Sequence, residues 1–304
     1  MQTILISLPV FLIIFFGWFF SKVNIADKNW THFLNGFAYY VALPALIISS
    51  FITVDFFNKS TWFLIFESIF LIIIFAIVVF FILSLFKIDK ITKTTILLGS
   101  IVGNTVFIGF PLVGMNFGNA YISQASLIGS FLLIIPIILV IIFIQSEHCT
   151  GNACYKKEFV SLLKNPLLLS IVFGIILSFI KKEFGMIESI EKTVSMLGAT
   201  ASPVALFALG TFLHGQSKKY LEWSFFVSFL KMILLPVIAI FISMFVFKNN
   251  DIKVLVLLSS MPVAVTTFVI AEKFELNKEL IGDSILISTI FSFIIAPIII
   301  SFFL

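Results

Sequence analysis

Arginine is missing from this sequence: all 19 of its Lys and Arg positions are lysines. Charged residues of both signs make up only 11% of the 304 residues, against about 25% in soluble domains. Hydrophobic residues make up 61% of the chain, and its mean hydropathy is +1.20. This composition excludes a water-soluble globular protein, a disordered chain and a protein that binds nucleic acid.

Cysteine is also scarce, because only Cys149 and Cys154 are present, in a polar loop that follows His148. Two thiols cannot build a disulfide framework, and a metal site needs about four ligands at a recognisable spacing. The phosphate-binding motif Gly-x-x-x-x-Gly-Lys-Ser/Thr is absent as well, so we exclude ATP as the energy source. We therefore expect two incidental loop thiols, no metal and no cofactor.

Long apolar runs dominate what is present. A membrane-spanning helix needs about 20 mostly apolar residues, and the first run has no lysine before it, unlike a cleaved signal peptide. The sequence therefore predicts an all-α polytopic membrane protein with ten transmembrane helices. Their windows are 3–21, 32–52, 61–86, 94–117, 121–145, 161–180, 190–213, 222–247, 252–271 and 279–303.

Lysines are distributed unevenly between the two ends of these windows. Twelve lie in or beside the loops after odd-numbered windows, six lie with the loops after even-numbered windows, and Lys231 lies inside the eighth window. Because cytoplasmic loops carry an excess of lysine, we place the odd loops in the cytoplasm and both termini outside. The loop with Cys149 and Cys154 is then cytoplasmic.

The prolines indicate an internal duplication. Three prolines of the first half recur in the second half at offsets of 157, 159 and 161: Pro9, Pro44 and Pro136 match Pro166, Pro203 and Pro297. A unit of five windows is odd, so two tandem copies, 1–150 and 151–304, would be inverted in the membrane, as in many secondary transporters. Chance spacing of prolines in a ten-helix protein is the alternative.

The fourth and ninth windows are rich in residues that weaken helices. Five of the 15 glycines fall within 99–118, together with Pro111, and the ninth window contains Pro262. Proline removes a backbone donor, and freed polar groups at membrane depth must be buried in protein or line a wet cavity. We expect both windows to be broken helices; tight helix packing at the glycines is the alternative.

A break in each window would create a binding site for an anion. The N-terminal end of a helix has unpaired N–H groups and about half a positive charge, which attract a carboxylate without a buried basic side chain. Asn104 can donate to such an anion, and Thr105, Thr266 and Thr267 add hydroxyl groups. A structural hydrogen bond is the alternative role for Asn104.

Ionisable residues inside the windows are few. Glu67 lies in the third window and Lys231 in the eighth. A buried carboxylate could couple transport to protons, and Lys231 could attract an anionic substrate; interfacial placement or local pairing is the alternative for each. Asp283 is expected near the cytoplasmic interface. Sodium coupling, through a site of Ser, Thr, Asn and backbone carbonyls, also stays open.

One segment of the fourth window resembles a known family. Residues 103–112 read Gly-Asn-Thr-Val-Phe-Ile-Gly-Phe-Pro-Leu, similar to the Asn-x-x-Phe-(Leu/Met)-Gly-x-Pro-Leu signature of the auxin efflux carrier family. Residues 42–46, 202–210 and 262–271 agree as well. That family includes bacterial malate or malonate permease-like proteins and plant auxin exporters, and is related in fold to bile acid/sodium symporters.

The resemblance implies two inverted five-helix repeats whose broken helices 4 and 9 cross. Helices 1, 2, 6 and 7 would form a scaffold that also forms a homodimer. Helices 3, 4, 5, 8, 9 and 10 would form a mobile transport domain that works as an elevator. Asn104 matches the family's substrate-carboxylate asparagine, and Pro111 and Pro262 match positions at or near the two breaks, which completes the predicted substrate-binding set.

These observations favour a secondary active transporter for a small organic acid, a mono- or dicarboxylate, in the cytoplasmic membrane. The alternatives are a sodium-coupled organic anion symporter of the bile-acid type and a membrane sensor or channel that does not transport. An intramembrane enzyme fits poorly, because His32 and His214 sit at window ends and Asp283 has no second aspartate beside it.

Overall fold

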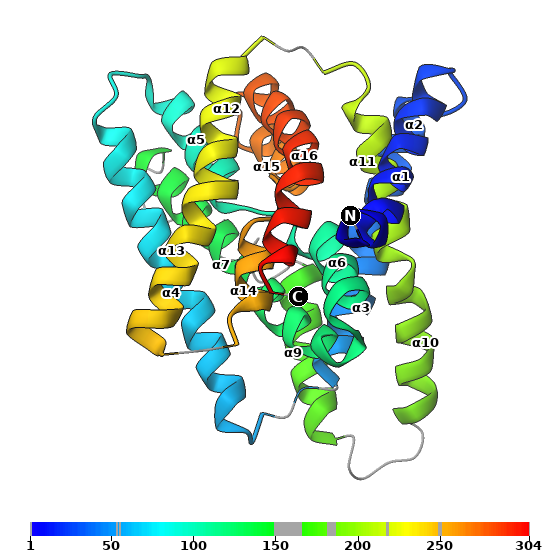
Figure 1. Cartoon of the computed structure of the whole chain (residues 1–304). Helices are drawn as coiled ribbons and strands as arrows, with labels where there is room; N and C mark the ends of the chain where they lie inside the picture. The colour runs from blue at the N-terminus through cyan, green and yellow to red at the C-terminus, as the bar shows by residue number, and fades with distance from the viewer. Residues whose placement is uncertain are drawn as a thin grey trace.

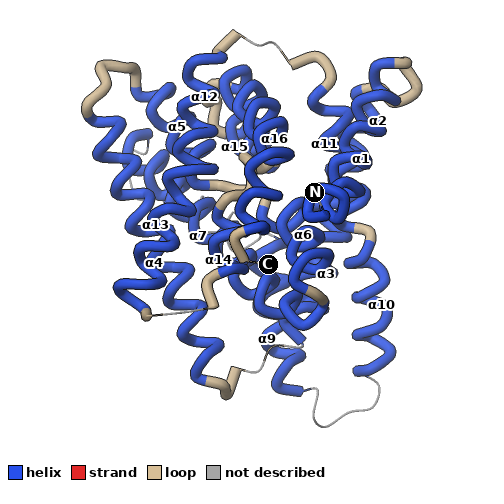
Figure 2. The backbone as a smooth tube through the Cα atoms, in the orientation of Figure 1, coloured by secondary structure: helices blue, strands red, loops and turns tan. Residues whose placement is uncertain are grey.

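The computed structural model describes residues 2–52, 54, 56–148, 166–180, 187–216, 219–248 and 251–303. Throughout these ranges the regular secondary structure is helical and no strand is formed, as Figure 2 shows. One isolated antiparallel bridge joins Gly103 to Val263. The all-α prediction is therefore confirmed for the described chain.

The first half of the chain forms seven numbered helices and three shorter turns of π or 3-10 helix, which are labelled η. In chain order they are α1 (Gln2–Lys22), α2 (Lys28–Phe37), η1 (Ala38–Ala42), α3 (Leu43–Ile52), α4 (Lys59–Ser84), α5 (Lys90–Ile101), η2 (Thr105–Gly109), α6 (Phe110–Phe117), η3 (Asn119–Tyr121) and α7 (Ile122–His148).

The described helices of the second half are again interrupted by π turns. They are α9 (Pro166–Ile180), α10 (Ile187–Ala199), α11 (Ala201–Leu213), α12 (Leu221–Phe229), η4 (Leu230–Leu234), α13 (Leu235–Phe241), η5 (Ile242–Phe247), α14 (Lys253–Ser259), α15 (Thr266–Lys273) and α16 (Lys278–Ser301).

Seven described segments are long and apolar enough to cross a membrane. These are Leu5–Lys22, Asn29–Ile52, Lys59–Ser84, Ile122–Val140, Ser189–Leu213, Leu221–Phe247 and Lys278–Ser301. The other three predicted windows also hold helices, but shorter ones: the sixth is α9, and the fourth and ninth are each divided into two pieces. Length alone therefore recovers seven of the ten predicted spans.

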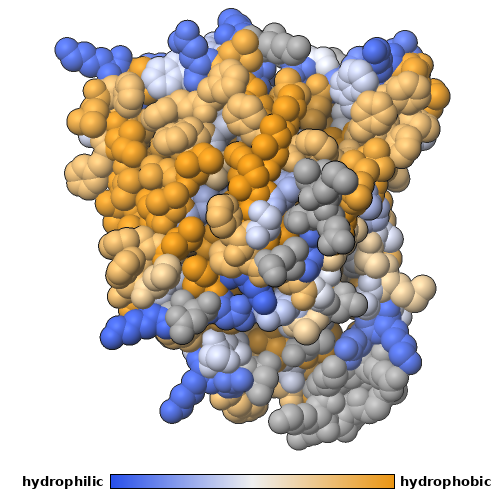
Figure 3. All heavy atoms as spheres, in the orientation of Figure 1, coloured by the Kyte–Doolittle hydropathy of each residue, from blue (hydrophilic) through white to orange (hydrophobic). Residues whose placement is uncertain are grey.

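The outer surface has a broad apolar band between two hydrophilic ends (Figure 3). Large side chains on the molecular surface are strongly exposed, among them Phe66 at 59%, Phe81 at 64% and Phe245 at 68%. Apolar area of this extent is rare on a soluble monomer and normal against lipid tails. The chain is therefore a multi-pass membrane protein.

Successive connections alternate between the two ends of the molecule. The α1–α2, α4–α5 and α11–α12 connections lie together at the upper end in Figure 1, whereas the α3–α4 connection lies at the lower end. The upper connections all follow odd-numbered windows, the ones with most lysines.

Local sequence explains where several helices begin. Asp27, Asn58, Asp89 and Asn277 precede α2, α4, α5 and α16, and each side chain accepts a hydrogen bond from a backbone N–H of the first turn. Such N-caps satisfy donors that have no partner within the helix. At Asp89 the hydrogen bonds from Thr92 lower the pKa of the carboxyl group.

Two helix pairs approach closely on one side of the molecule. α1 packs on α11, where Gly17 and Gly210 face each other's backbones, and α3 packs on α9 beside Gly174. On the other side α4 packs on α7 and α12 packs on α16. The divided helices, α5 with α6 and α14 with α15, lie among α7, α11 and α16.

Candidate functional site

The two helix breaks meet inside the molecule. α5 ends at Ile101 and η2 begins at Thr105, while α14 ends at Ser259 and α15 begins at Thr266. The backbones of the breaks pair: the Asn104 N–H donates to the Pro262 carbonyl at 2.7 Å, and the Ala264 N–H donates to the Val102 carbonyl at 3.2 Å. We call this region, 102–104 with 260–265, the crossing.

Local chemistry accounts for the position of the second break. Proline has no N–H and disfavours helical geometry at the residue before it, here Met261. The freed carbonyl of Pro262 accepts from Asn104, and the Val263 N–H donates to the Ser288 hydroxyl of α16 at 3.0 Å. Polar backbone groups at membrane depth are thus bonded to protein rather than exposed to lipid.

The crossing separates helix ends of opposite polarity. α5 and α14 arrive with their C-terminal ends, and η2 and α15 leave with their N-terminal ends. Helix dipoles place about half a negative charge at each C-terminal end and about half a positive charge at each N-terminal end. A cation is therefore favoured at the C-terminal ends of α5 and α14, and an anion at the N-terminal ends of η2 and α15.

Asn104 lies at the start of η2, at the anion-favouring side. Asn104 is only 4% exposed, and its backbone carbonyl accepts from the Ile108 and Gly109 N–H groups at 3.4 Å. In the described part of the chain, the side-chain carboxamide makes no hydrogen bond. An amide that is not bonded within the protein can donate to a carboxylate.

The three predicted threonines differ in their bonding. Thr105 donates to the Gly129 carbonyl of α7 at 3.2 Å, and Thr267 donates to the Ala264 carbonyl at 2.6 Å. The Thr266 hydroxyl is buried and has no hydrogen-bond partner among the described residues. Of the three, Thr266 therefore has a hydroxyl left for a ligand.

The two predicted prolines have different positions. Pro262 lies within its break, but Pro111 is the second residue of α6, seven positions after Asn104. The helix continues through Pro111 because the preceding turn, η2, is a π-helix, whose wider spacing accommodates a residue without an N–H. The first break is at 102–104, at Gly103 and Asn104.

The two predicted ionisable residues are both buried. Glu67 is fully buried on α4, which packs against α7 and α5. Lys231, in η4, is 1% exposed, and its ammonium donates to the Ser259 carbonyl at 3.2 Å. The structure therefore brings Lys231 to the crossing, at the C-terminal end of α14.

Asp283 lies near the start of α16, as expected, but it is fully buried within the protein. Its carboxylate accepts from the Tyr220 N–H at 2.9 Å, just before α12. The N-terminal end of α12 attracts this negative charge into the protein. Gly129 and Ser288 also bond to the broken segments, and nothing in their local sequence indicates these contacts.

The described residues include no group of three or more His, Cys, Asp or Glu side chains that could hold a metal ion. The predicted incidental thiols, Cys149 and Cys154, lie outside the described residues. What the crossing offers a ligand is therefore amide, hydroxyl and backbone N–H groups, with one ammonium group beside them.

Similarity to known proteins extends over the whole chain. The sequence profile of the membrane transport protein family matches residues 4–300. An uncharacterized transporter of Methanocaldococcus jannaschii is 28% identical, with 95% of each chain covered. A putative malonate transporter of Rhizobium meliloti is 25% identical over 94% of this chain and 91% of its own. A probable auxin efflux carrier component of Oryza sativa subsp. japonica is 26% identical over 49% of this chain and 38% of its own.

Proposed function

Because the chain belongs to the membrane transport protein family, which includes the auxin efflux carriers, we propose that it moves a small organic acid across the cytoplasmic membrane as a secondary active transporter. The observation that carries the proposal is the position of Asn104 at the N-terminal end of η2, where the residue is 4% exposed and its side chain forms no capping hydrogen bond. An amide donor and a helix N-terminus together suit a carboxylate.

The substrate class follows from the chemistry of this side of the crossing. Asn104 and Thr266 provide neutral donors, and no arginine exists in the chain to clamp a phosphate or sulfate. One relative is named as a putative malonate transporter, and malonate is a dicarboxylate. We therefore propose a mono- or dicarboxylate, bound by Asn104 and Thr266 between the breaks at Gly103 and Pro262, whereas the hydroxyls of Thr105 and Thr267 donate within the protein.

The helix pairing supports two inverted five-helix repeats, 1–150 and 151–304. Each helix of the first repeat has a counterpart five windows later in the second. By this correspondence the contact between α1 and α11 matches the contact between α9 and α3. The contact between α4 and α7 likewise matches the contact between α12 and α16. The contact between α5 and α16 matches the contact between α14 and α7 in the same way. A pseudo-twofold relation of this kind is typical of secondary transporters.

The same pairing supports an elevator mechanism. α1, α3, α9 and α11 would form the scaffold and the dimer surface of a homodimer, and the remaining spanning helices would carry the crossing across the bilayer. The two groups contact each other where α3 packs on α7, α1 on α6 and α16, and α11 on η2 and α16. In this arrangement the substrate moves with its site, and both termini lie outside the cell.

A transport assay tests the proposal. Purified protein in proteoliposomes should accumulate labelled malonate, malate or indole-3-acetate when an ion gradient or a counter-substrate is supplied. Flux should saturate with concentration. Unsaturated ohmic current would indicate a pore instead, and no movement of any carboxylate under any gradient would refute the assignment. Comparing sodium, proton and potassium gradients identifies the coupling ion, including the sodium-coupled alternative.

Asn104→Ala tests the residue that carries the proposal. Loss of a hydrogen bond to a charged group costs about 1.5–3 kcal/mol, so carboxylate affinity should fall by about 10- to 100-fold. Asn116→Ala is the matched control, because Asn116 lies on α6 and donates to the Leu112 carbonyl at 2.9 Å, away from the crossing. Equal loss in both variants would remove Asn104 from the binding site.

A further inference from the structure

A single buried ammonium group lies at the crossing. Lys231 is among the largest fully buried side chains of the described molecule, in the same class as core phenylalanines and leucines. Its one hydrogen bond is to the Ser259 carbonyl, and no described carboxylate forms an ion pair with it. Placing an ammonium in a protein interior is expensive unless negative charge compensates it.

The carbonyl that Lys231 contacts is one that the helix break leaves without a backbone donor. In a continuous helix the Ser259 carbonyl would accept from the Val263 N–H. That N–H donates instead to the Ser288 hydroxyl at 3.0 Å, and the Ser260 and Met261 N–H groups bond further back in α14. The ammonium therefore takes the place of the donor that α14 loses at its end.

The other break provides the room for this ammonium. A β-carbon on Gly103 would lie only 2.6 Å from the Lys231 Nζ and 2.5 Å from its Cε. Gly103 follows the C-terminal end of α5 by two residues, and Ser259 is the last residue of α14. The ammonium thus lies beside the C-terminal ends of both broken helices, where partial negative charge accumulates.

We propose that Lys231 is a positioning residue whose ammonium group takes the place that a bound cation would have at the crossing. Its ammonium bridges the C-terminal ends of α5 and α14 and offsets their negative charge. The opposite N-terminal ends, with Asn104, are then held in register for the substrate carboxylate. The crossing consequently needs no bound sodium ion for its stability. The substrate part of this inference rests on the proposed function, whereas the cation part does not.

The first test measures the thermal stability of purified protein without substrate. The Tm of the unaltered protein should be the same in sodium, potassium and choline chloride at equal ionic strength. Lys231→Ala should lower the Tm, and propylammonium should restore part of the loss, because the small side chain leaves space for the amine. Lys231→Met also removes the charge but fills the space, so propylammonium should not restore it.

The second test measures carboxylate binding in the same variants. Lys231→Ala should weaken carboxylate binding because the N-terminal ends lose their register, and propylammonium should recover part of the lost affinity. Lys253→Met is the control, because Lys253 is a partly exposed lysine at the start of α14, at the other end of that helix from Ser259, and is hydrogen-bonded to Tyr121 at 2.8 Å. Its variant should show no dependence on amine or sodium.

Gly103→Ala gives an independent route if the lysine variants fail to fold. Its new methyl group would displace the ammonium, so stability should fall as in Lys231→Met. The double variant Gly103→Ala/Lys231→Met should have a Tm no lower than that of either single variant, because both substitutions remove the same interaction. Three results would each overturn the inference. The Tm losses of the two single variants could add in the double variant, or the Tm of the unaltered protein could rise specifically with sodium. Lys231→Ala could also bind carboxylate with the affinity of the unaltered protein. If no carboxylate moves at all, the proposed function fails, and amine rescue of the Tm still decides the role of Lys231.

Discussion

Buried hydroxyl groups at the crossing fall into two kinds, those bonded within the protein and those left open. Thr105 ties η2 to α7 through the Gly129 carbonyl, whereas the Thr266 hydroxyl has no partner among the described residues. The two residues have the same side chain and both lie at the start of a helix that leaves the crossing. Only their surroundings distinguish a structural role from a binding role.

Replacing each threonine by the isosteric valine separates these roles. Thr105→Val should lower the free energy of unfolding by about 1 kcal/mol, because the Gly129 carbonyl loses its donor. Thr266→Val should leave the Tm unchanged or slightly higher and should weaken carboxylate binding. Thermal unfolding with and without malonate measures both effects. The reverse pattern, with Thr266→Val the less stable variant, would mean that Thr266 is structural.

At the scale of elements, three π turns share one position relative to proline. η1, η2 and η4 each end two residues before a proline, namely Pro44, Pro111 and Pro236. A proline inside a helix lacks the N–H that would bond to the preceding turn and clashes with it. A π turn widens that preceding turn and relieves the clash, although α1, α7 and α16 also continue through Pro9, Pro136 and Pro297 without one. At Gly103 and Pro262, by contrast, each weakened segment has a partner break to bond with, and both helices are interrupted.

Close approach of α1 and α11 gives a prediction at this scale. A β-carbon on Gly17 would overlap the Phe207 carbonyl group, whereas one on Gly36, within α2, would meet nothing within 4 Å. Gly17→Ala should therefore destabilise the protein by about 1–3 kcal/mol or more, because backbone cannot move aside. Gly36→Ala should stabilise it by about 0.5–1 kcal/mol through helix propensity. Paired thermal unfolding of the two variants checks the contrast, and a stable Gly17→Ala would show that the two helices can separate without cost.

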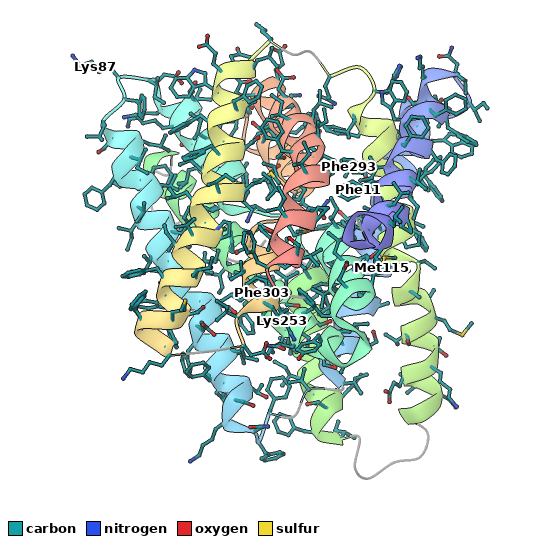
Figure 4. All side chains as sticks on the ribbon, viewed as in Figure 1. Phe11, Lys87, Met115, Lys253, Phe293 and Phe303 are labelled. Carbon is teal, nitrogen blue, oxygen red and sulfur yellow. The ribbon has the colours of Figure 1, made fainter. Side chains whose placement is uncertain are left out.

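For the whole molecule, the arrangement of connections allows the orientation to be tested. Lys87 is exposed at the upper end (Figure 4), and Lys59 is exposed at the start of α4, at the opposite end. With Cys149 and Cys154 replaced by serine, a membrane-impermeant maleimide should label Lys59→Cys in intact cells and Lys87→Cys only after permeabilisation. Labelling in the reverse order would invert the predicted orientation while leaving the fold unchanged.

Much of this protein followed from composition and local pattern. Apolar runs predicted a helical membrane protein, and the motif around Asn104 predicted the transporter family; both are confirmed. The weakness of the fourth and ninth windows also followed, because glycine and proline act on the backbone of their own segment. Local chemistry cannot give exact break positions: the sequence leaves the first break open between Asn104 and Pro111, and in the structure it lies at 102–104.

Composition and local motifs were thus enough to establish the class of the fold, the presence of two weakened helices and the identity of the polar residues within them. Helix packing in three dimensions was needed to pair Gly103 with Val263, to bring the ammonium of Lys231 to the Ser259 carbonyl, and to bury Asp283. The physical reason is sequence distance. Lys231 and Ser259 are 28 residues apart, Tyr220 and Asp283 are 63 apart, and Gly103 and Val263 are 160 apart. Their contacts come from how separate helices pack, which no single segment encodes.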